Sequence, residues 1–118
     1  MFTASHQCYA DVILDYLDPD HNLIHHRLYR EHCVVTPEGI HIKNLEVLGN
    51  RDLKNVVIID NAVYSFGYQL DNGIPMIPFY DNRADKELVL LMQYLESLEE
   101  VEDVRLHNRK AFSLYNFN

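Results

Sequence analysis

The sequence predicts an α/β fold in which a parallel sheet is flanked by helices. Three observations carry this prediction. Residues 56–59 form a strand that is apolar on both faces, and amphipathic helical patterns precede and follow that strand. The chain has 118 residues, of which 47% are hydrophobic, which is enough for one core and too little for two. We therefore expect one compact domain.

The first element expected is a helix that starts after Ser5, a residue type that caps helices. Its apolar side chains recur at helical spacing, so one face should be buried: they are Tyr9, Val12, Ile13, Tyr16 and Leu17. The turn sequence Asp18-Pro19-Asp20 ends the pattern.

A β-hairpin is expected next. The pattern from Arg27 to Val35 favours a strand, and "TPEG" at residues 36–39 places proline in the second position of a turn. Residues 40–43, "IHIK", then alternate as a second strand does.

The parallel strand follows. Val56 to Ile59 is apolar on both faces, which is typical of a strand covered from two sides. "GIPMIPF" at residues 73–79 is a second short apolar segment, and its two prolines restrict it to an edge or a brief strand. A helix is predicted from about Asp85, with a leucine and methionine stripe from Leu88 to Leu98. The acidic run Glu96 to Asp103 is interpreted as a solvated face.

Composition excludes several classes of function. Eighteen acidic and ten basic residues give a net charge of −8, which repels phosphate backbones and argues against direct nucleic-acid binding. No apolar stretch approaches the ~18 residues of a membrane span, and no signal-peptide pattern occurs, so a soluble intracellular protein is expected. The two cysteines are too few for a disulfide framework.

Asp60 and Asn61 directly follow the predicted parallel strand. Ligands bind beyond the carboxyl ends of strands in open α/β sheets. A carboxylate beside an amide oxygen suits Mg²⁺, which prefers oxygen ligands. The alternative is that these two residues only cap the next segment, as Asp and Asn often do.

Three further side chains fit recognition of a phosphoryl group. Lys43 and Arg30 lie in the two arms of the predicted hairpin, and Thr3 carries a hydroxyl. Each also has an ordinary interpretation, as a solvent-exposed cation or a β-branched strand residue. A structural zinc site is not favoured, because the seven histidines and two cysteines match no closed zinc spacing.

The order of several short motifs is more specific than any single residue. "FTAS", "CYAD", "LYREHC", "GIHIKNL", "LGNRDLKNVVIIDN" and "DNGIPMIPFYDN" follow one another before a final helix ending in "VEDVR". This succession resembles the small C-terminal-domain phosphatases and NLI-interacting-factor-like phosphatases, a branch of the haloacid dehalogenase superfamily. The resemblance covers residues 2–105, and it implies a Rossmannoid parallel sheet with an inserted β-hairpin.

The resemblance also implies a function and residue roles. Members of this family remove phosphate from phosphoserine or phosphothreonine in proteins and need Mg²⁺. By position, Thr3 resembles the hydroxyl that holds the phosphoryl group and Lys43 the cation that stabilises it. Asn61 resembles the metal ligand, with Asp60 supporting the metal's water shell. Tyr9 and Arg30 resemble contacts on the substrate side.

One family feature does not occur in this sequence. The family attacks phosphate with the first aspartate of an Asp-x-Asp-x-Thr motif on the central strand, and no such motif is present. Asp18-Pro19-Asp20 has two suitably spaced carboxylates, but it lies in a turn. We therefore expect residues 2–105 to be the C-terminal two-thirds of a phosphatase domain without its central strand, followed by a tail at 106–118.

Three consequences follow for activity and partners. The chain alone should be inactive, and either a longer gene product, a second chain or copy, or a rearrangement would replace the missing strand. The alternative is a non-catalytic binding subunit on the same fold, because relatives in mitochondrial import are receptors. The nucleus or cytoplasm is the expected compartment, with the mitochondrion as the alternative.

Overall fold

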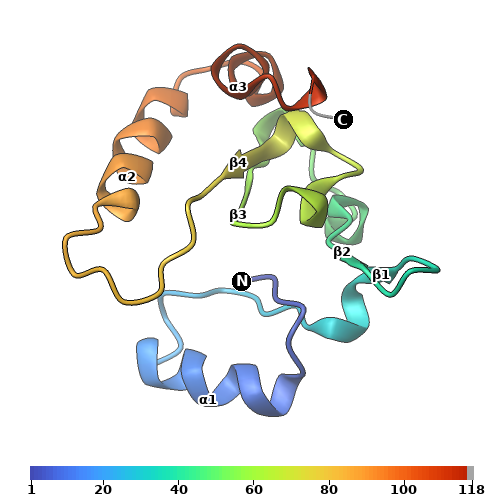
Figure 1. Ribbon diagram of the computed structural model, residues 1–118, viewed down its shortest axis with the longest axis vertical. Helices are drawn as coiled ribbons and strands as arrows, with labels where there is room; N and C mark the ends of the chain where they lie inside the picture. Colours follow the sequence, from blue (N-terminus) through green and yellow to red (C-terminus); the bar gives the residue numbers. More distant parts are fainter. Residues whose placement is uncertain (117–118) are drawn as a thin grey trace. The chain divides into compact units, whose positions relative to one another are not determined.

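The computed structural model describes residues 1–116, which form two compact units. We call Met1–Val47 the N-terminal unit and the remainder, from Leu48, the C-terminal unit. Short 3₁₀ turns separate the regular elements, which Figure 1 labels in chain order. These elements are α1 (Gln7–Leu17), β1 (Val34–Val35), β2 (His41–Ile42), β3 (Ile58–Asp60), β4 (Gly73–Pro75), α2 (Glu87–Leu98) and α3 (Val104–Phe112).

Helix α1 begins one residue later than the sequence suggests. Its N-cap is His6, which makes no side-chain capping bond, so the prediction that Ser5 caps the helix is wrong. The backbone of Ser5 is engaged elsewhere, because its carbonyl accepts a hydrogen bond from the backbone N–H of Arg30 at 3.1 Å. The helix ends at Leu17, as the following Asp-Pro-Asp turn predicts.

The buried face of α1 is not the predicted one. Ala10 and Leu14 are buried and pack with Tyr29 and Ile24, whereas the predicted stripe is exposed, up to 86% for Tyr16. The reason is that the packing partner in this unit is the segment around residues 24–29, and that segment covers only the narrow side of the helix that carries Ala10. The wider apolar stripe has no cover in the N-terminal unit.

Strands β1 and β2 pair antiparallel, with Val34 opposite Ile42 and Val35 opposite His41. The turn between them is "TPEG", in which the N–H of Gly39 donates to the carbonyl of Thr36 at 2.9 Å. Gly39 has φ of +85°, a conformation that glycine adopts without a steric penalty. The strand expected from Arg27 is shorter than predicted, because Arg30–His32 forms a 3₁₀ turn.

Strands β3 and β4 form a parallel pair, in register Ile58 to Gly73 and Asp60 to Pro75. The chain is therefore a mixed α/β structure with a parallel sheet. The strand was expected to be covered on both faces, but only Ile58 is buried and Ile59 is 40% exposed. Among the described residues β3 pairs with β4 alone, so the sheet has two strands. Ile74, the register partner of Ile59, is buried against α2 and α3, so this face is covered over β4 and only partly covered at Ile59.

The core of the C-terminal unit joins β4 to the last two helices. Ile74, Leu98 and Val104 are buried together, and Leu91 and Leu95 of α2 pack against them. The predicted leucine stripe is thus partly buried, while Leu88 and Met92 remain exposed. The final helix does not run through "VEDVR", because α2 ends at Leu98 and α3 begins at Val104, where the carboxylate of Asp103 accepts the N–H of Arg105.

Two tightly constrained positions fix the β4 end of this core. The ring of Phe66, which is 0% exposed, lies where a side chain on Gly73 would go, since a Cβ there would sit 2.1 Å from the ring. The side-chain amide of Asn72 donates to the carbonyls of Leu53 and Val56, at 2.7 and 2.8 Å. Within residues 1–116, no helix is long and apolar enough to cross a membrane.

Candidate functional site

The Thr3 hydroxyl lies in a loop that is fixed by the backbone. Phe2 bridges Leu28 in parallel, and the N–H of Thr3 donates to the carbonyl of Leu28 at 2.9 Å. The Thr3 Oγ1 atom accepts the N–H of Ser5 at 3.1 Å. In this bond the hydroxyl oxygen is the acceptor, so the hydroxyl hydrogen can still be donated to an anionic oxygen.

Arg30 borders the same loop. Its Nε atom donates to the carbonyl of Ala4 at 2.5 Å, and its backbone N–H donates to that of Ser5. These two bonds hold the base of an otherwise exposed guanidinium beside Thr3. The terminal amino groups of an arginine anchored through Nε can still bind a phosphate or carboxylate.

A pocket of about 150 Å³ joins Thr3 to helix α1. Thr3 and Ser5 line it from the loop, and Tyr9 and Ile13 line it from the helix. Tyr9 is 63% exposed, so its ring stands at the solvent-facing side of α1. The structure therefore brings Thr3 and Tyr9 together around one pocket, with Arg30 bonded to the adjoining loop.

Lys43 follows β2 and is half-buried in the N-terminal unit. The expectation that it reaches a bound phosphoryl group stays a prediction. Asp60 and Asn61 belong to the C-terminal unit, so the structure describes the two sets of predicted site residues in separate units.

Asp60 is the last residue of β3, at its carboxyl end, and Asn61 follows it in an exposed position. One carboxylate oxygen of Asp60 accepts the N–H of Ala62 at 2.9 Å. This is the turn-capping role of the alternative interpretation, and it engages one of the two carboxylate oxygens. The backbone carbonyl of Asp60 accepts the N–H of Met76 at 3.1 Å, which anchors the turn to the segment after β4.

The donor chemistry of this turn fits Mg²⁺ in part. A carboxylate and an exposed amide oxygen are the hard ligands that Mg²⁺ takes, and this ion commonly uses one or two carboxylates together with water. Within residues 1–116, no three His, Cys, Asp or Glu side chains gather in a group that could hold a metal. Asp60 and Asn61 therefore represent at most part of a complete coordination shell.

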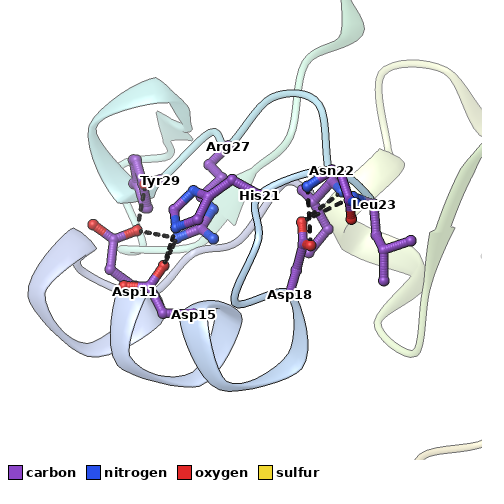
Figure 2. A network of polar contacts seen from close by, with 9 residues as sticks. Asp11, Asp15, Asp18, His21, Asn22, Leu23, Arg27 and Tyr29 are labelled. Atoms are coloured by element: carbon purple, nitrogen blue, oxygen red, sulfur yellow. Dashed lines mark hydrogen bonds and ion pairs between the residues drawn. The ribbon is translucent and has the colours of Figure 1, made fainter.

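A charged network on α1 was missed by the sequence analysis (Figure 2). Arg27 binds the carboxylates of Asp11 at 3.0 Å and Asp15 at 2.9 Å, and the hydroxyl of Tyr29 donates to Asp11 at 2.6 Å. His21 lies 3.2 Å from Asp15. The hydrogen bond from Tyr29, followed by that from Arg27, lowers the pKa of Asp11. Two carboxylates four residues apart on a predicted helix were the available signal, but their arginine partner is distant in sequence.

Asp18, next to this network in Figure 2, closes the turn after α1. It is 1% exposed, and its carboxylate accepts the backbone N–H groups of Asn22, Leu23 and Ile24. The hydrogen bond from Ile24 is the largest cause of its lowered pKa. Asp18 and the network thus hold the segment that leads from α1 to Arg30.

Comparison with known proteins gives these residues a family context. The model of the family described as NLI interacting factor-like phosphatase matches residues 1–105. CTD small phosphatase-like protein 2 of Dictyostelium discoideum is 53% identical over 115 residues, covering 98% of this chain and 20% of the relative. The human Carboxy-terminal domain RNA polymerase II polypeptide A small phosphatase 1 is 41% identical, covering 88% of this chain and 39% of the relative.

A relative of a different kind also matches. The Mitochondrial import inner membrane translocase subunit TIM50 of Candida glabrata is 42% identical over 117 residues, covering 93% of this chain and 24% of the relative. The chain thus spans between a fifth and two fifths of the length of these three relatives. The match of the family model extends over most of the chain and includes all six predicted site residues. The chain therefore belongs to the NLI interacting factor-like phosphatase family.

Proposed function

We propose that this chain supplies part of the active site of a Mg²⁺-dependent phosphatase that acts on phosphoserine or phosphothreonine in proteins. The observation that carries the proposal is the family match over residues 1–105, within which Asp60 and Asn61 stand at the carboxyl end of a parallel strand. In this proposal residues 2–105 are the C-terminal two-thirds of the domain, and residues 106–118 are its tail.

Each predicted residue has a role in this proposal. Thr3 donates its hydroxyl hydrogen to a phosphoryl oxygen, and Lys43 offsets phosphoryl charge. Tyr9 and Arg30 contact the substrate around the phosphate. Asp60 and Asn61 hold Mg²⁺, which supplies further positive charge to the phosphoryl group when bound. Phosphoryl transfer depends mainly on such positioning and charge neutralisation.

The nucleophile must come from a segment that contains the Asp-x-Asp-x-Thr motif. The printed sequence has no such motif, so we expect the 118-residue chain to be inactive alone. We propose that the motif strand, from a longer product, a second chain or a second copy, pairs with the outer edge of β3. The 40% exposure of Ile59 supports this, since part of its apolar side chain is left uncovered by the described residues of its own unit.

A phosphatase assay with a phosphoserine peptide and Mg²⁺ tests the proposal in two steps. The chain is assayed alone, and then with the motif segment of a family member either added as a peptide or fused before Met1. We expect turnover only with the motif segment. Asn61→Ala should then abolish it, whereas Asn55→Ala, a change at an exposed residue outside the site, should leave it intact.

Two results would contradict this proposal. Turnover by the chain alone that disappears in Asn61→Ala would refute the claim of inactivity. A fused, folded protein without turnover would refute the catalytic role. Thr3→Ser serves as the conservative control for Thr3→Val, because serine keeps both the donor hydrogen and the oxygen that accepts the N–H of Ser5.

A non-catalytic binding subunit is the second candidate, favoured by the 42% identity to a translocase subunit. Its test is co-purification with a stable partner. Binding that is unchanged in Lys43→Ala and Asn61→Ala would favour this role, because a scaffold does not need a phosphate site. We propose the nucleus or cytoplasm as the compartment, with the mitochondrion, which the name of the translocase relative contains, as the alternative.

A further inference from the structure

Asn72 and Gly73 form an asparagine–glycine pair at the start of β4, and no other asparagine in the sequence precedes a glycine. Asparagine is among the chemically labile residues. A glycine after the asparagine increases this lability. Glycine has no side chain to shield its backbone nitrogen, and it leaves that nitrogen free to move. Both residues of the pair are nevertheless required by the packing of the C-terminal unit.

The requirement for glycine is steric. A Cβ at position 73 would lie 2.1 Å from the ring of Phe66, which is fully buried and therefore has no room to move aside. Asparagine is required because its side-chain amide donates two hydrogen bonds. Its Nδ2 atom carries the two hydrogens that the carbonyls of Leu53 and Val56 accept. A residue with fewer donors would leave a buried carbonyl unpaired.

The same packing protects the pair from its own chemistry. Asn72 is 2% exposed, at the wall of a pocket of about 390 Å³, so water and hydroxide meet little of this residue. Both Nδ2 hydrogens are engaged, and the N–H of Gly73 donates to the carbonyl of Leu70, which opposes its deprotonation. Asn72 also ends a 3₁₀ turn, so its backbone conformation is held by the hydrogen-bonded turn.

We propose that Asn72 is a deamidation site that opens only when the C-terminal unit unfolds. In the open chain, the Gly73 nitrogen loses its proton and attacks the Cγ atom of Asn72. A C–N bond forms, and the side-chain nitrogen leaves as ammonia after taking up a proton. Water then hydrolyses the resulting succinimide at either carbonyl, which gives aspartate or isoaspartate. No oxidant, reductant or cofactor is needed.

The product cannot restore the native contacts. Aspartate at position 72 places a carboxylate against the carbonyl oxygens of Leu53 and Val56, which then lose two donors and face a negative charge. Isoaspartate in addition lengthens the backbone where Gly73 must meet Phe66 and pair with Ile58. Each opening therefore carries a chance of permanent loss of the fold. This inference does not depend on the proposed phosphatase function.

The test compares the purified chain in buffer with the same chain in urea above its unfolding midpoint, both at mildly alkaline pH. Peptide mapping by mass spectrometry and an enzymatic isoaspartate assay follow position 72 over time. We expect deamidation to be faster in urea by a factor of about 10³ or more, the lower end of the ratio of folded to unfolded molecules in small domains. Equal rates in buffer and urea would overturn the proposal.

Asn61 provides the internal control, since it is exposed and is followed by alanine. Its slower deamidation should change little between buffer and urea. After removal of urea, the fraction modified at position 72 should fail to regain protected β4 amides, while unmodified molecules regain them. Asn72→Asp should behave as the modified fraction does, and Asn72→Asp with wild-type stability would overturn the claim that the modification is irreversible in its effect.

Discussion

The two units use opposite chemistry to hold their loop backbones. In the N-terminal unit the buried carboxylate of Asp18 accepts three backbone N–H groups, and Arg27 joins two further carboxylates to the segment that carries Tyr29. In the C-terminal unit the buried amides of Asn72 and Asn108 donate to backbone carbonyls. The first arrangement depends on charge and pH, and the second does not.

Their apolar cores differ as well. The N-terminal unit has a small cluster of Ala10, Leu14 and Tyr29, with Ile24 beside it. The C-terminal unit has a larger cluster that unites β4 with α2 and α3. In the N-terminal unit, which buries fewer apolar side chains, hydrogen bonds to charged groups hold the loops that apolar packing holds in the C-terminal unit. Substitutions can separate the two strategies, and the following ones are arranged from the largest expected effect to the smallest.

Phe66→Ala should produce the largest loss of stability. The ring is fully buried against Gly73, so its removal leaves a cavity in the C-terminal unit and should lower the free energy of unfolding by about 3 to 5 kcal/mol. Urea denaturation monitored by circular dichroism measures the change. The nearby Tyr64→Ala is the control, because Tyr64 is 59% exposed. Equal effects of the two substitutions would show that this core does not carry the stability of the unit.

Asn108→Ala should have a smaller effect. Asn108 donates to the carbonyl of Asp71 at 2.9 Å and accepts the hydroxyl of Tyr94 at 2.5 Å, so truncation removes the donor of the Asp71 carbonyl and leaves the Tyr94 hydroxyl with His107 as its partner. A loss of about 1 to 3 kcal/mol is expected from such an orphaned group. The loss should be the same at low and at high salt, since an amide carries no charge. A salt-dependent loss would contradict the division between the units.

Acid should weaken the N-terminal unit first. The pKa values of Asp11 and Asp18 are lowered in the folded chain, so their stabilisation is complete above the ordinary aspartate pKa of about 3.9. It is lost as the pH falls through the lowered values, because the unfolded chain takes up protons first. Residue-resolved amide exchange as the pH is lowered from 5 should show opening of α1 and the turn at residues 22–24 before β4.

Two substitutions isolate this effect. Asp18→Asn should remove most of the pH dependence of the 22–24 turn and lower its protection at neutral pH. Asp103→Asn is the matched change in the C-terminal unit, where Arg105 lowers the pKa of Asp103. It should alter the start of α3 and leave the turn unchanged. Simultaneous opening of both units in acid, with either substitution, would refute the comparison.

Gly39→Ala should have the smallest effect, about 1 kcal/mol. The position has φ of +85° and nothing lies within 4 Å of an added Cβ, so the cost is conformational and not steric. The chemical shifts of β1 and β2 report any change of the turn. Gly49→Ala, at φ of +68° and also in open space, is the matched substitution, and the hairpin should respond only to the first.

Local signals in the sequence predicted most of the regular elements. The turn with Pro37 and Gly39 identifies the hairpin, Asp18 marks the end of α1, and the apolar run before Asp60 identifies the parallel strand. The buried side of α1 could not be predicted, because it is decided by Tyr29, which lies many residues away. The break between α2 and α3 was also missed, since Asp103, which caps the start of α3, fits a helix surface equally well.

The residues of the candidate site also divide into those that a local sequence signal identifies and those whose arrangement depends on distant contacts. Asp60 and Asn61 were identified from their place after a strand, a local signal. Thr3 and Arg30 were candidates for phosphoryl recognition from their side-chain chemistry, and Tyr9 entered through the family resemblance. Only the structure shows that a backbone bridge to Leu28 sets the loop of Thr3. The Arg27 network depends on a contact with Asp11 that no local pattern encodes.

The small sheet of β3 and β4 has a consequence for handling the purified chain. Within residues 1–116 no third strand joins these two, and Ile59 is 40% exposed, so the sheet can template the addition of an extended segment, including that of another copy. The net charge of −8 opposes such contacts between copies, but only across a screening distance of ~10 Å at 0.1 M salt. Colloidal stability should therefore fall as salt is raised or as the pH approaches the isoelectric point of 5.2. In dilute, low-salt solutions at neutral pH, copies of the chain should therefore not associate through this sheet.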